Sequence, residues 1–317
     1  MLKHLRFATL WLTGLILVAS CTSSEKQQQA QEEETPATAR KIFDYVPPKP
    51  ENGTAMGAVI LGSSGFDAFR IEMDTARNWQ LLEAQYGVSG VYENNAEMAD
   101  IRVGLENYVK SFLDNGVSGD NIHFIVSSSA KENEKVQVIM RILDELGYVV
   151  NEVDEEMEAR CAFYAAVPKD FQDKAFVVDV GSGNTKISWL QNDQVYSEYT
   201  YGSKYHLDNV SDSTAYVSAL KASMSIPEAS IDYAFVIGGA PYQLAKDIRI
   251  GEERYTTLKA PDQYPGITDQ KSLNGLKLYE GIKFSTKCEQ FIFDWHCNFA
   301  IGFLLLLGES EAEETTG

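Results

Sequence analysis

The stretch Phe176-Val177-Val178-Asp179-Val180-Gly181-Ser182-Gly183-Asn184-Thr185 decides the fold of this chain. An apolar run that ends in a carboxylate and a glycine-serine turn is typical of a buried strand leading into a tight turn. Two more strand-like segments follow, over 186–190 and 195–200. The sequence therefore predicts a strand, a tight turn and two further strands that form a hairpin.

The same arrangement occurs once more, near the start of the body of the chain. The apolar run 55–61 meets the turn Gly62-Ser63-Ser64-Gly65, and 66–73 then alternates between apolar and polar residues. A third apolar strand, over 233–237, ends in Gly238-Gly239 ahead of a helix that we expect to begin near Pro241. The repeated unit predicts two related α/β lobes.

Further elements connect these units. Spacing of apolar residues predicts helices over 98–113, 136–147 and 154–166, and short apolar runs predict strands over 79–83, 123–126 and 148–150. The terminal run 291–307 is strongly apolar, but Asp294, His296 and Asn298 interrupt it and leave it too short to span a bilayer. We expect that run to form a helix packed in the core.

The acidic composition narrows the classes of ligand. The 317 residues include 27 basic and 46 acidic side chains, for a net charge of −19. That charge repels phosphate backbones and anionic headgroups, so we expect no nucleic acid as a partner and no membrane attachment through a basic patch. A polyanionic ligand needs a local site that is positive or holds a metal.

Cys288 and Cys297 are open to pairing in an oxidising compartment or to remaining as buried thiols.

The N-terminus has the features of an export signal. Residues 1–20 join Lys3 and Arg6 to an apolar stretch and end in Val18-Ala19-Ser20 before Cys21, which predicts a signal peptide. Small residues directly before a cysteine resemble a bacterial lipobox, which implies a lipid anchor on Cys21 and a chain that faces a non-cytoplasmic compartment of the cell envelope. Thr22 follows the cysteine where an aspartate would retain some lipoproteins at an inner membrane, which favours the outer membrane.

Composition also divides the rest of the chain. Residues 21–50 are rich in polar residues and proline and predict a flexible tether, while 309–317 form an acidic tail. The two lobes are expected over 51–165 and 166–308. No linker-like stretch separates the elements of these lobes.

Three glycine-bearing turns after apolar strands are candidates for phosphate binding. Glycine and small hydroxyl residues let backbone N–H groups approach a phosphate closely and point at it. The candidate residues are Gly62, Ser63, Ser64, Gly181, Ser182, Gly183, Asn184, Gly238 and Gly239. Hairpin turns use the same residues without binding any ligand, so the order of the motifs carries more information than any one of them.

Four motifs occur in an order that resembles a known family. The segment 58–66 looks like the first phosphate motif of exopolyphosphatases and guanosine pentaphosphate phosphohydrolases, and 176–185 looks like their second. Between them, 153–160 is similar to an acidic helix start that ends in Glu-Ala-Arg, and 126–131 resembles a Thr-Ser-Ala-x-Arg segment. The resemblance extends from about residue 55 to 245.

This resemblance implies both a fold and a site. The family belongs to the actin, Hsp70 and sugar-kinase superfamily, so it implies two ribonuclease-H-like, actin-like ATPase lobes with a phosphate-binding cleft between them. Glu158 takes the position of the carboxylate that activates water, and Asp179 that of the carboxylate that works with a divalent metal, Mg²⁺ or Mn²⁺. Lys131 takes the place of a phosphate-binding arginine. The implied reaction is hydrolysis of a phosphoanhydride in polyphosphate or a nucleotide.

Three departures from the family pattern leave a second hypothesis open. Ile60 stands where the first phosphate motif has an acidic residue, Lys131 replaces the arginine, and Lys186 replaces a glutamate. A lysine lacks the bidentate fork with which arginine holds phosphate. The alternative to an enzyme is therefore a catalytically degenerate lipoprotein that binds a ligand or a protein on the cell envelope, and the sequence identifies no protein partner.

Overall fold

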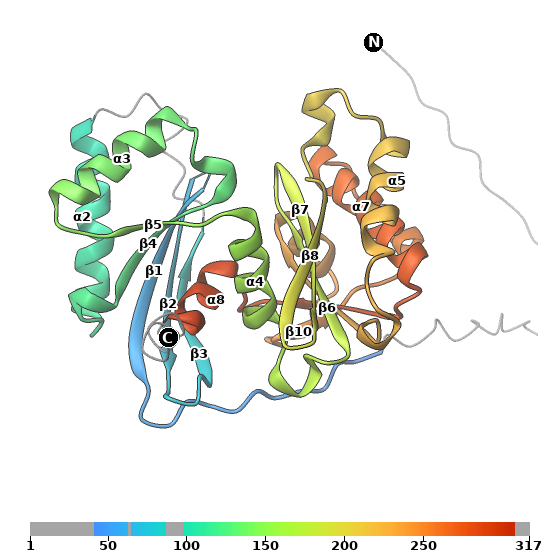
Figure 1. Ribbon diagram of the computed structural model, residues 1–317, viewed down its shortest axis with the longest axis horizontal. Coiled ribbons are helices and arrows are strands. Elements are labelled where there is room, and N and C mark those ends of the chain that lie inside the picture. The colour runs from blue at the N-terminus through green and yellow to red at the C-terminus, as the bar shows by residue number, and fades with distance from the viewer. Residues whose placement is uncertain (1–40, 63–64, 87–97, 308–317) are drawn as a thin grey trace, which may run out of the picture. The chain divides into compact units, whose positions relative to one another are not determined.

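The computed structural model describes residues 41–62, 65–86 and 98–307 of the chain. Several predicted features lie outside these residues, namely the signal peptide over 1–20, Cys21, the tether as far as residue 40, Ser63, Ser64 and the acidic tail over 309–317. The described part forms two β-sheets with helices against both faces of each (Figure 1).

The first sheet has the strand order β3-β2-β1-β4-β5. Its strands are β1 (Thr54–Gly62), β2 (Gly65–Met73), β3 (Trp79–Gln85), β4 (Ile122–Val126) and β5 (Val150–Glu152). The first three strands are antiparallel, whereas β4 and β5 run parallel to β1. Helices α2 (Met98–Asp114) and α3 (Glu134–Glu145) cover its outer face through Leu105, Phe112 and Ile139.

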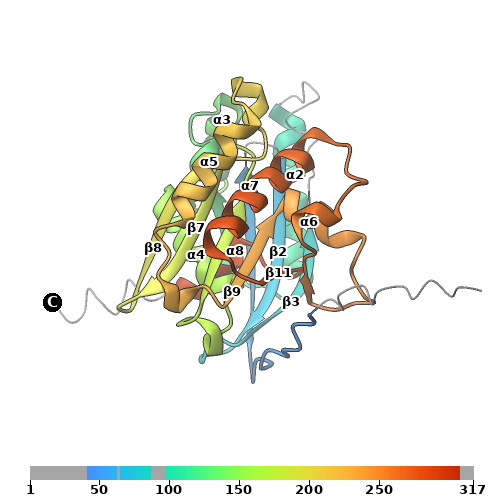
Figure 2. The ribbon, with the colours of Figure 1, turned by 90° about the vertical axis from the view of Figure 1, so that its right-hand side faces the viewer.

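The second sheet has the order β10-β11-β9-β6-β7-β8. Its strands are β6 (Ala175–Val180), β7 (Asn184–Gln191), β8 (Gln194–Tyr201), β9 (Tyr233–Gly238), β10 (Tyr255–Thr257) and β11 (Gln290–Asp294). Helices α5 (Asp212–Ser223), α6 (Gly239–Lys246) and α7 (Gln270–Thr286) cover one face, which Figure 2 presents to the viewer. The hairpin β6–β7 continues directly into β8, as the opening sequence stretch predicts.

Two helices fill the space between the sheets. α4 (Glu155–Ala166) and α8 (Phe299–Leu306) lie there side by side (Figure 1), and their apolar side chains join those of both sheets in one core. The two helices approach so closely that a Cβ added at Gly302 would lie 1.8 Å from the carbonyl oxygen of Cys161. Alanines at 162, 165 and 166 allow this approach because they keep the facing surface of α4 small.

The structure corrects the prediction for the terminal apolar run. Its first part is β11, a strand that pairs with β9 and β10, and α8 begins only at Phe299. Periodicity does not separate a short buried strand from a buried helix, and pairing between distant strands decides the outcome here. α8 also packs on β1 and β2, so the end of the predicted second lobe completes the core of the first.

The predicted tether is also corrected at its C-terminal end. Phe43 is buried in a group of aromatic rings, with its centroid 5.0 Å from that of Phe171 and 5.2 Å from that of Tyr255. Tyr45 donates a hydrogen bond to Asp170. Burial of aromatic surface fixes this segment against the second sheet.

The alternatives left open for Cys288 and Cys297 have a clear outcome. Cys288 and Cys297 are free buried thiols, so of the two alternatives the structure has the unpaired one. Among residues 41–62, 65–86 and 98–307, no helix is long and apolar enough to cross a bilayer.

Candidate functional site

A cavity of about 710 Å³ lies where strands from both sheets end. Gly62, Val180, Gly238 and Asp294 are the last residues of β1, β6, β9 and β11, and all four line it. In α/β sheets, ligands bind beyond the carboxyl ends of the strands. We call this cavity the cleft. Its lining includes the predicted residues Glu158, Asp179, Gly181, Ser182, Gly183, Asn184 and Gly239.

The turn between β6 and β7 is held so that its amides are available. Ser203 and Lys204 donate backbone hydrogen bonds to the carbonyls of Gly181 and Ser182, at 2.9 and 3.0 Å. Within the described residues, the backbone amides of Ser182 and Gly183 donate to no protein acceptor. Successive free amides in a turn form a concave site that suits an anion.

Glycine is required where β9 leads into α6. Gly238 has φ +106°, and a Cβ there would lie 2.3 Å from the carbonyl oxygen of Val180. Above the next residue, Gly239, a Cβ would meet the Nζ of Lys271 at 2.9 Å. The strand end therefore stays close to β6, and a cation from α7 lies over it.

Glu158 enters the cleft from the first turns of α4. The side chain of Asp154 caps this helix by accepting a hydrogen bond from the amide of Met157 at 2.8 Å. Glu158 is only 3 % exposed; its Oε1 accepts from the amide of Ser128, and its Oε2 lies 2.6 Å from the Nζ of Lys186. Both oxygens thus have a fixed partner, so the carboxylate is held in one orientation.

Asp179 and Lys186 are cross-strand neighbours on β6 and β7. Burial raises the pKa of Asp179 to about 6; the charge of Lys186 works against this shift and that of Glu158 adds to it. Burial would lower the pKa of Lys186, but the charges of Asp179 and Glu158 outweigh it and raise that pKa. Lys186 therefore carries a positive charge beside two acidic groups.

The side chains around Asp179 do not fit the expected divalent metal. Mg²⁺ and Mn²⁺ are held by several oxygen ligands. In the described part of the chain, no three His, Cys, Asp or Glu side chains form a group that could hold a metal ion. Lys186 already contacts Glu158 and faces Asp179 across the strands.

The remaining predicted residues have distinct positions. Ile60 lines the cleft and faces Asp67 across the β1–β2 pair. Lys131 does not line the cleft; its Nζ lies 3.9 Å from the carboxylate of Glu152. Its role in phosphate binding remains a prediction.

The cleft also contains residues that the sequence did not indicate. Asp67, Lys271, Asp294 and Trp295 line it, and each comes from a different element or connection. The only sequence signal for Asp67 is a carboxylate within an alternating strand just after the first glycine turn. No motif marks Lys271, since nothing in the sequence indicates that α7 begins beside the cleft.

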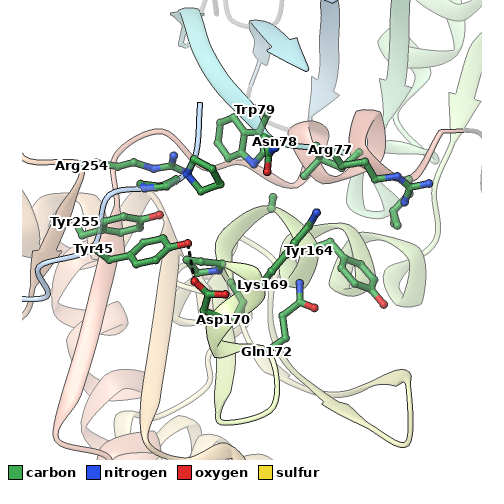
Figure 3. A pocket seen from close by; sticks show the side chains of 17 residues that line it. Tyr45, Arg77, Asn78, Trp79, Tyr164, Lys169, Asp170, Gln172, Arg254 and Tyr255 are labelled. Carbon is green, nitrogen blue, oxygen red and sulfur yellow. Dashed lines mark hydrogen bonds between the residues drawn. The ribbon is translucent and has the colours of Figure 1, made fainter. Parts of the chain in front are cut away.

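A second cavity, of about 420 Å³, contains none of the predicted phosphate-binding residues. Figure 3 shows its lining, in which Trp79, Arg254 and Tyr255 lie on one side and Tyr164, Lys169 and Gln172 on the other. The Arg254 guanidinium lies 4.5 Å from the centroid of the Trp79 ring. This cavity is called the aromatic cavity below.

Comparison with solved structures identifies the fold. The Aquifex aeolicus member of the Ppx/GppA protein family matches with a TM-score of 0.60 and 14% sequence identity, over 84% of this chain and 99% of that chain. An exopolyphosphatase from Cytophaga hutchinsonii matches with a TM-score of 0.59 and 15% identity, over 81% of this chain and 98% of that chain. No protein-family model matches the sequence, and no curated protein matches it.

Identity at this level is evidence of a common fold alone. The predicted α/β fold is confirmed: two lobes of the actin-like class enclose a cleft at the ends of their strands. The chain is similar in fold to a member of the Ppx/GppA protein family and to an exopolyphosphatase, both of solved structure.

Proposed function

We propose that the cleft binds a phosphoanhydride compound, polyphosphate or a nucleotide, and that Glu158 promotes hydrolysis of its terminal bond. The observation that carries this proposal is the meeting of Glu158 with two glycine turns, at Gly181–Gly183 and Gly238–Gly239, in one cavity. The turns supply amides for an anion and α4 supplies the carboxylate. The similarity in fold to exopolyphosphatases supports the same kind of reaction.

The reaction follows from these groups without a metal-dependent step. A water molecule attacks the terminal phosphorus, the bond from that phosphorus to the bridging oxygen breaks, and Glu158 accepts the proton of the water. The free amides of Ser182 and Gly183 stabilise the charge on the phosphoryl oxygens, together with the ammonium group of Lys186. The products are inorganic phosphate and a chain shorter by one phosphate.

Phosphate release from pyrophosphate, tripolyphosphate, long-chain polyphosphate and ATP tests this proposal. We expect release by the wild type and a loss of about a hundredfold or more in Glu158→Gln, because positioned general bases contribute on that order. Glu156→Gln is the matched control, since Glu156 lies on the same helix but is exposed and does not line the cleft. Release that persists unchanged in Glu158→Gln would rule out the mechanism.

Binding without turnover is the second candidate, and the surroundings of Glu158 favour it. The amide of Ser128 and the ammonium of Lys186 both contact the carboxylate, and Ile60 supplies no second acid nearby. In that case pyrophosphate raises the melting temperature of the chain, because a ligand that binds only the folded state stabilises it. The same assays then detect no release from any substrate.

We also propose that the chain is anchored to an envelope membrane by a lipid on Cys21. The signal-like residues 1–20 and the small residues before Cys21 support this location. Metabolic labelling with a palmitate analogue should modify the wild type and not Cys21→Ser, and only the wild type should sediment with membranes. Labelling of Cys21→Ser at the wild-type level would contradict the proposal.

A further inference from the structure

The cleft contains a buried group of three charges that is unusual for a site expected to bind a metal. Glu158, Asp179 and Lys186 are 3 %, 9 % and 4 % exposed, and all three line the same cavity. Buried charges are costly unless they are paired. Two acidic groups and one ammonium group balance much of this cost among themselves.

The ammonium group of Lys186 has one N–H donor more than it has acceptors among the described residues. An ammonium group has three N–H donors. Its Nζ lies 2.6 Å from Oε2 of Glu158 and 3.0 Å from Oδ1 of Asn184, and no further acceptor for it occurs among the described residues. The third N–H is therefore available to an oxygen of a ligand.

The surrounding residues hold the ammonium in place. Asn184 also donates from Nδ2 to Oε1 of Glu155 at 2.5 Å, which ties the start of β7 to the first turn of α4. Ser188 on the same strand donates to the carbonyl of Ala159 at 3.3 Å. These contacts fix β7 against α4, so Lys186 and Glu158 stay together as the walls of the cleft.

We propose that the Lys186 ammonium takes the place of a divalent cation, so that the cleft binds a phosphate-containing anion directly and without metal. This inference rests on the proposed function for the identity of the ligand. A divalent cation would need oxygen donors from Asp179 and Glu158 that already face the ammonium. The lysine thus supplies permanently, on one side chain, the positive charge that a metal would supply reversibly.

Titration with Mn²⁺, followed by electron paramagnetic resonance of the free ion, tests the replacement of the metal without any phosphate. We expect no binding by the wild type at submillimolar Mn²⁺. Lys186→Glu places a third carboxylate beside Glu158 and Asp179 and should bind Mn²⁺, with a rise in melting temperature on adding the metal. If Lys186→Glu does not fold, Lys186→Gln supplies an amide oxygen and should bind Mn²⁺ more tightly than the wild type. Wild-type binding that Asp179→Asn abolishes would overturn the proposal.

Calorimetric titration with pyrophosphate, in EDTA and in Mg²⁺, tests the contact with the anion. The wild type should bind with the same affinity in both solutions, and Lys186→Met should bind roughly ten- to a hundredfold more weakly in both, as expected for a lost charge-assisted hydrogen bond. Lys277→Met is the control, because Lys277 pairs with Glu280 outside the cleft. Wild-type binding that requires Mg²⁺ would overturn the proposal.

The two measurements separate the possible failures. A wild type that binds pyrophosphate in neither solution contradicts the phosphate ligand, and with it the proposed function. The Mn²⁺ titration still decides whether Lys186 stands in place of a metal, since it uses no phosphate.

Discussion

Arg254 and Asp294 form a buried ion pair that connects the aromatic cavity to the cleft. The Nη2 of Arg254 lies 3.0 Å from Oδ2 of Asp294, and its Nε lies 3.1 Å from Oδ1. Arg254 lines the aromatic cavity, whereas Asp294 lines the cleft. The pair lies where β10 and β11 adjoin, so the lining of one cavity is tied to that of the other.

Removing one member of this pair should destabilise the fold strongly. The Asp294 side chain is 0 % exposed and that of Arg254 is 16 % exposed. Arg254→Met leaves an unpaired buried carboxylate, which costs about 3 to 5 kcal/mol. The unfolding free energy from urea denaturation measures this loss.

The double variant Arg254→Met/Asp294→Asn serves as the control. It removes both charges, so it should recover part of the stability lost in Arg254→Met. If the double variant were less stable than Arg254→Met by as much as Asp294→Asn alone destabilises the wild type, the two side chains would not act as a pair.

Gly238 should tolerate no side chain. Gly238→Ala forces a Cβ to within 2.3 Å of the Val180 carbonyl at a positive φ, and we expect a loss of about 2 to 4 kcal/mol. Gly183→Ala is the matched substitution in the other turn, where a Cβ meets no atom within 4 Å among the described residues, and it should change stability by less than about 1 kcal/mol. Equal urea midpoints for the two variants would contradict the argument.

The strands β1, β6 and β9, which end at the cleft, could be predicted, whereas β11 and α7, which complete it, could not. An apolar run followed by a glycine turn predicts the β6–β7 unit, and both signals lie within one short stretch of sequence. α7 gave no comparable signal, because Gly275 and Gly281 lie within it where it approaches Ala240 and the backbone of Tyr216. Close helix packing selects these glycines, and they weaken the helical pattern.

Asp179 should make stability depend on pH. Its folded-state pKa of about 6 lies above the ordinary 3.8, so between these values the folded chain keeps a proton that the unfolded chain has lost. The stability from this group is full below pH 3.8 and is lost as the pH rises through 6. Wild-type stability relative to Asp179→Asn should therefore fall by on the order of 3 kcal/mol between pH 3.5 and 7. Urea denaturation of both proteins at several pH values measures this difference in unfolding free energy. A difference that stays constant or rises with pH would contradict the prediction.

The buried thiols should react only after unfolding. Burial raises the pKa of Cys161 to about 12 and that of Cys288 to about 11, and it raises the pKa of Cys297 well above its ordinary value. The thiolate is the reactive form, so a disulfide reagent at pH 8 should modify the folded Cys21→Ser variant on the order of a hundredfold more slowly than the unfolded one. Unfolding without reductant should expose three thiols that react with the reagent. If only one thiol reacts, Cys288 and Cys297 form a disulfide.

The site was predictable only as far as its motifs are local. Glu158, Asp179 and the glycine turns could be found because each stands in a short recognisable segment. Whether Lys186 contacts Glu158 depends on the distance between β7 and α4, which no local pattern encodes. The same holds for Asp294, whose partner Arg254 is 40 residues away along the chain.

The position of α8 has a consequence for how the chain folds during synthesis. The chain builds the first sheet and α4, then the whole second sheet, and only then returns with Phe299–Leu306 to the faces of β1, β2 and α4. When only the first lobe has emerged from the ribosome, α8 has not yet been synthesised, so the inner apolar surface of that lobe is not yet covered. Gly302, close against Cys161, lies in the last described helix to be synthesised, so the core of the first lobe can be complete only after α8 has been made.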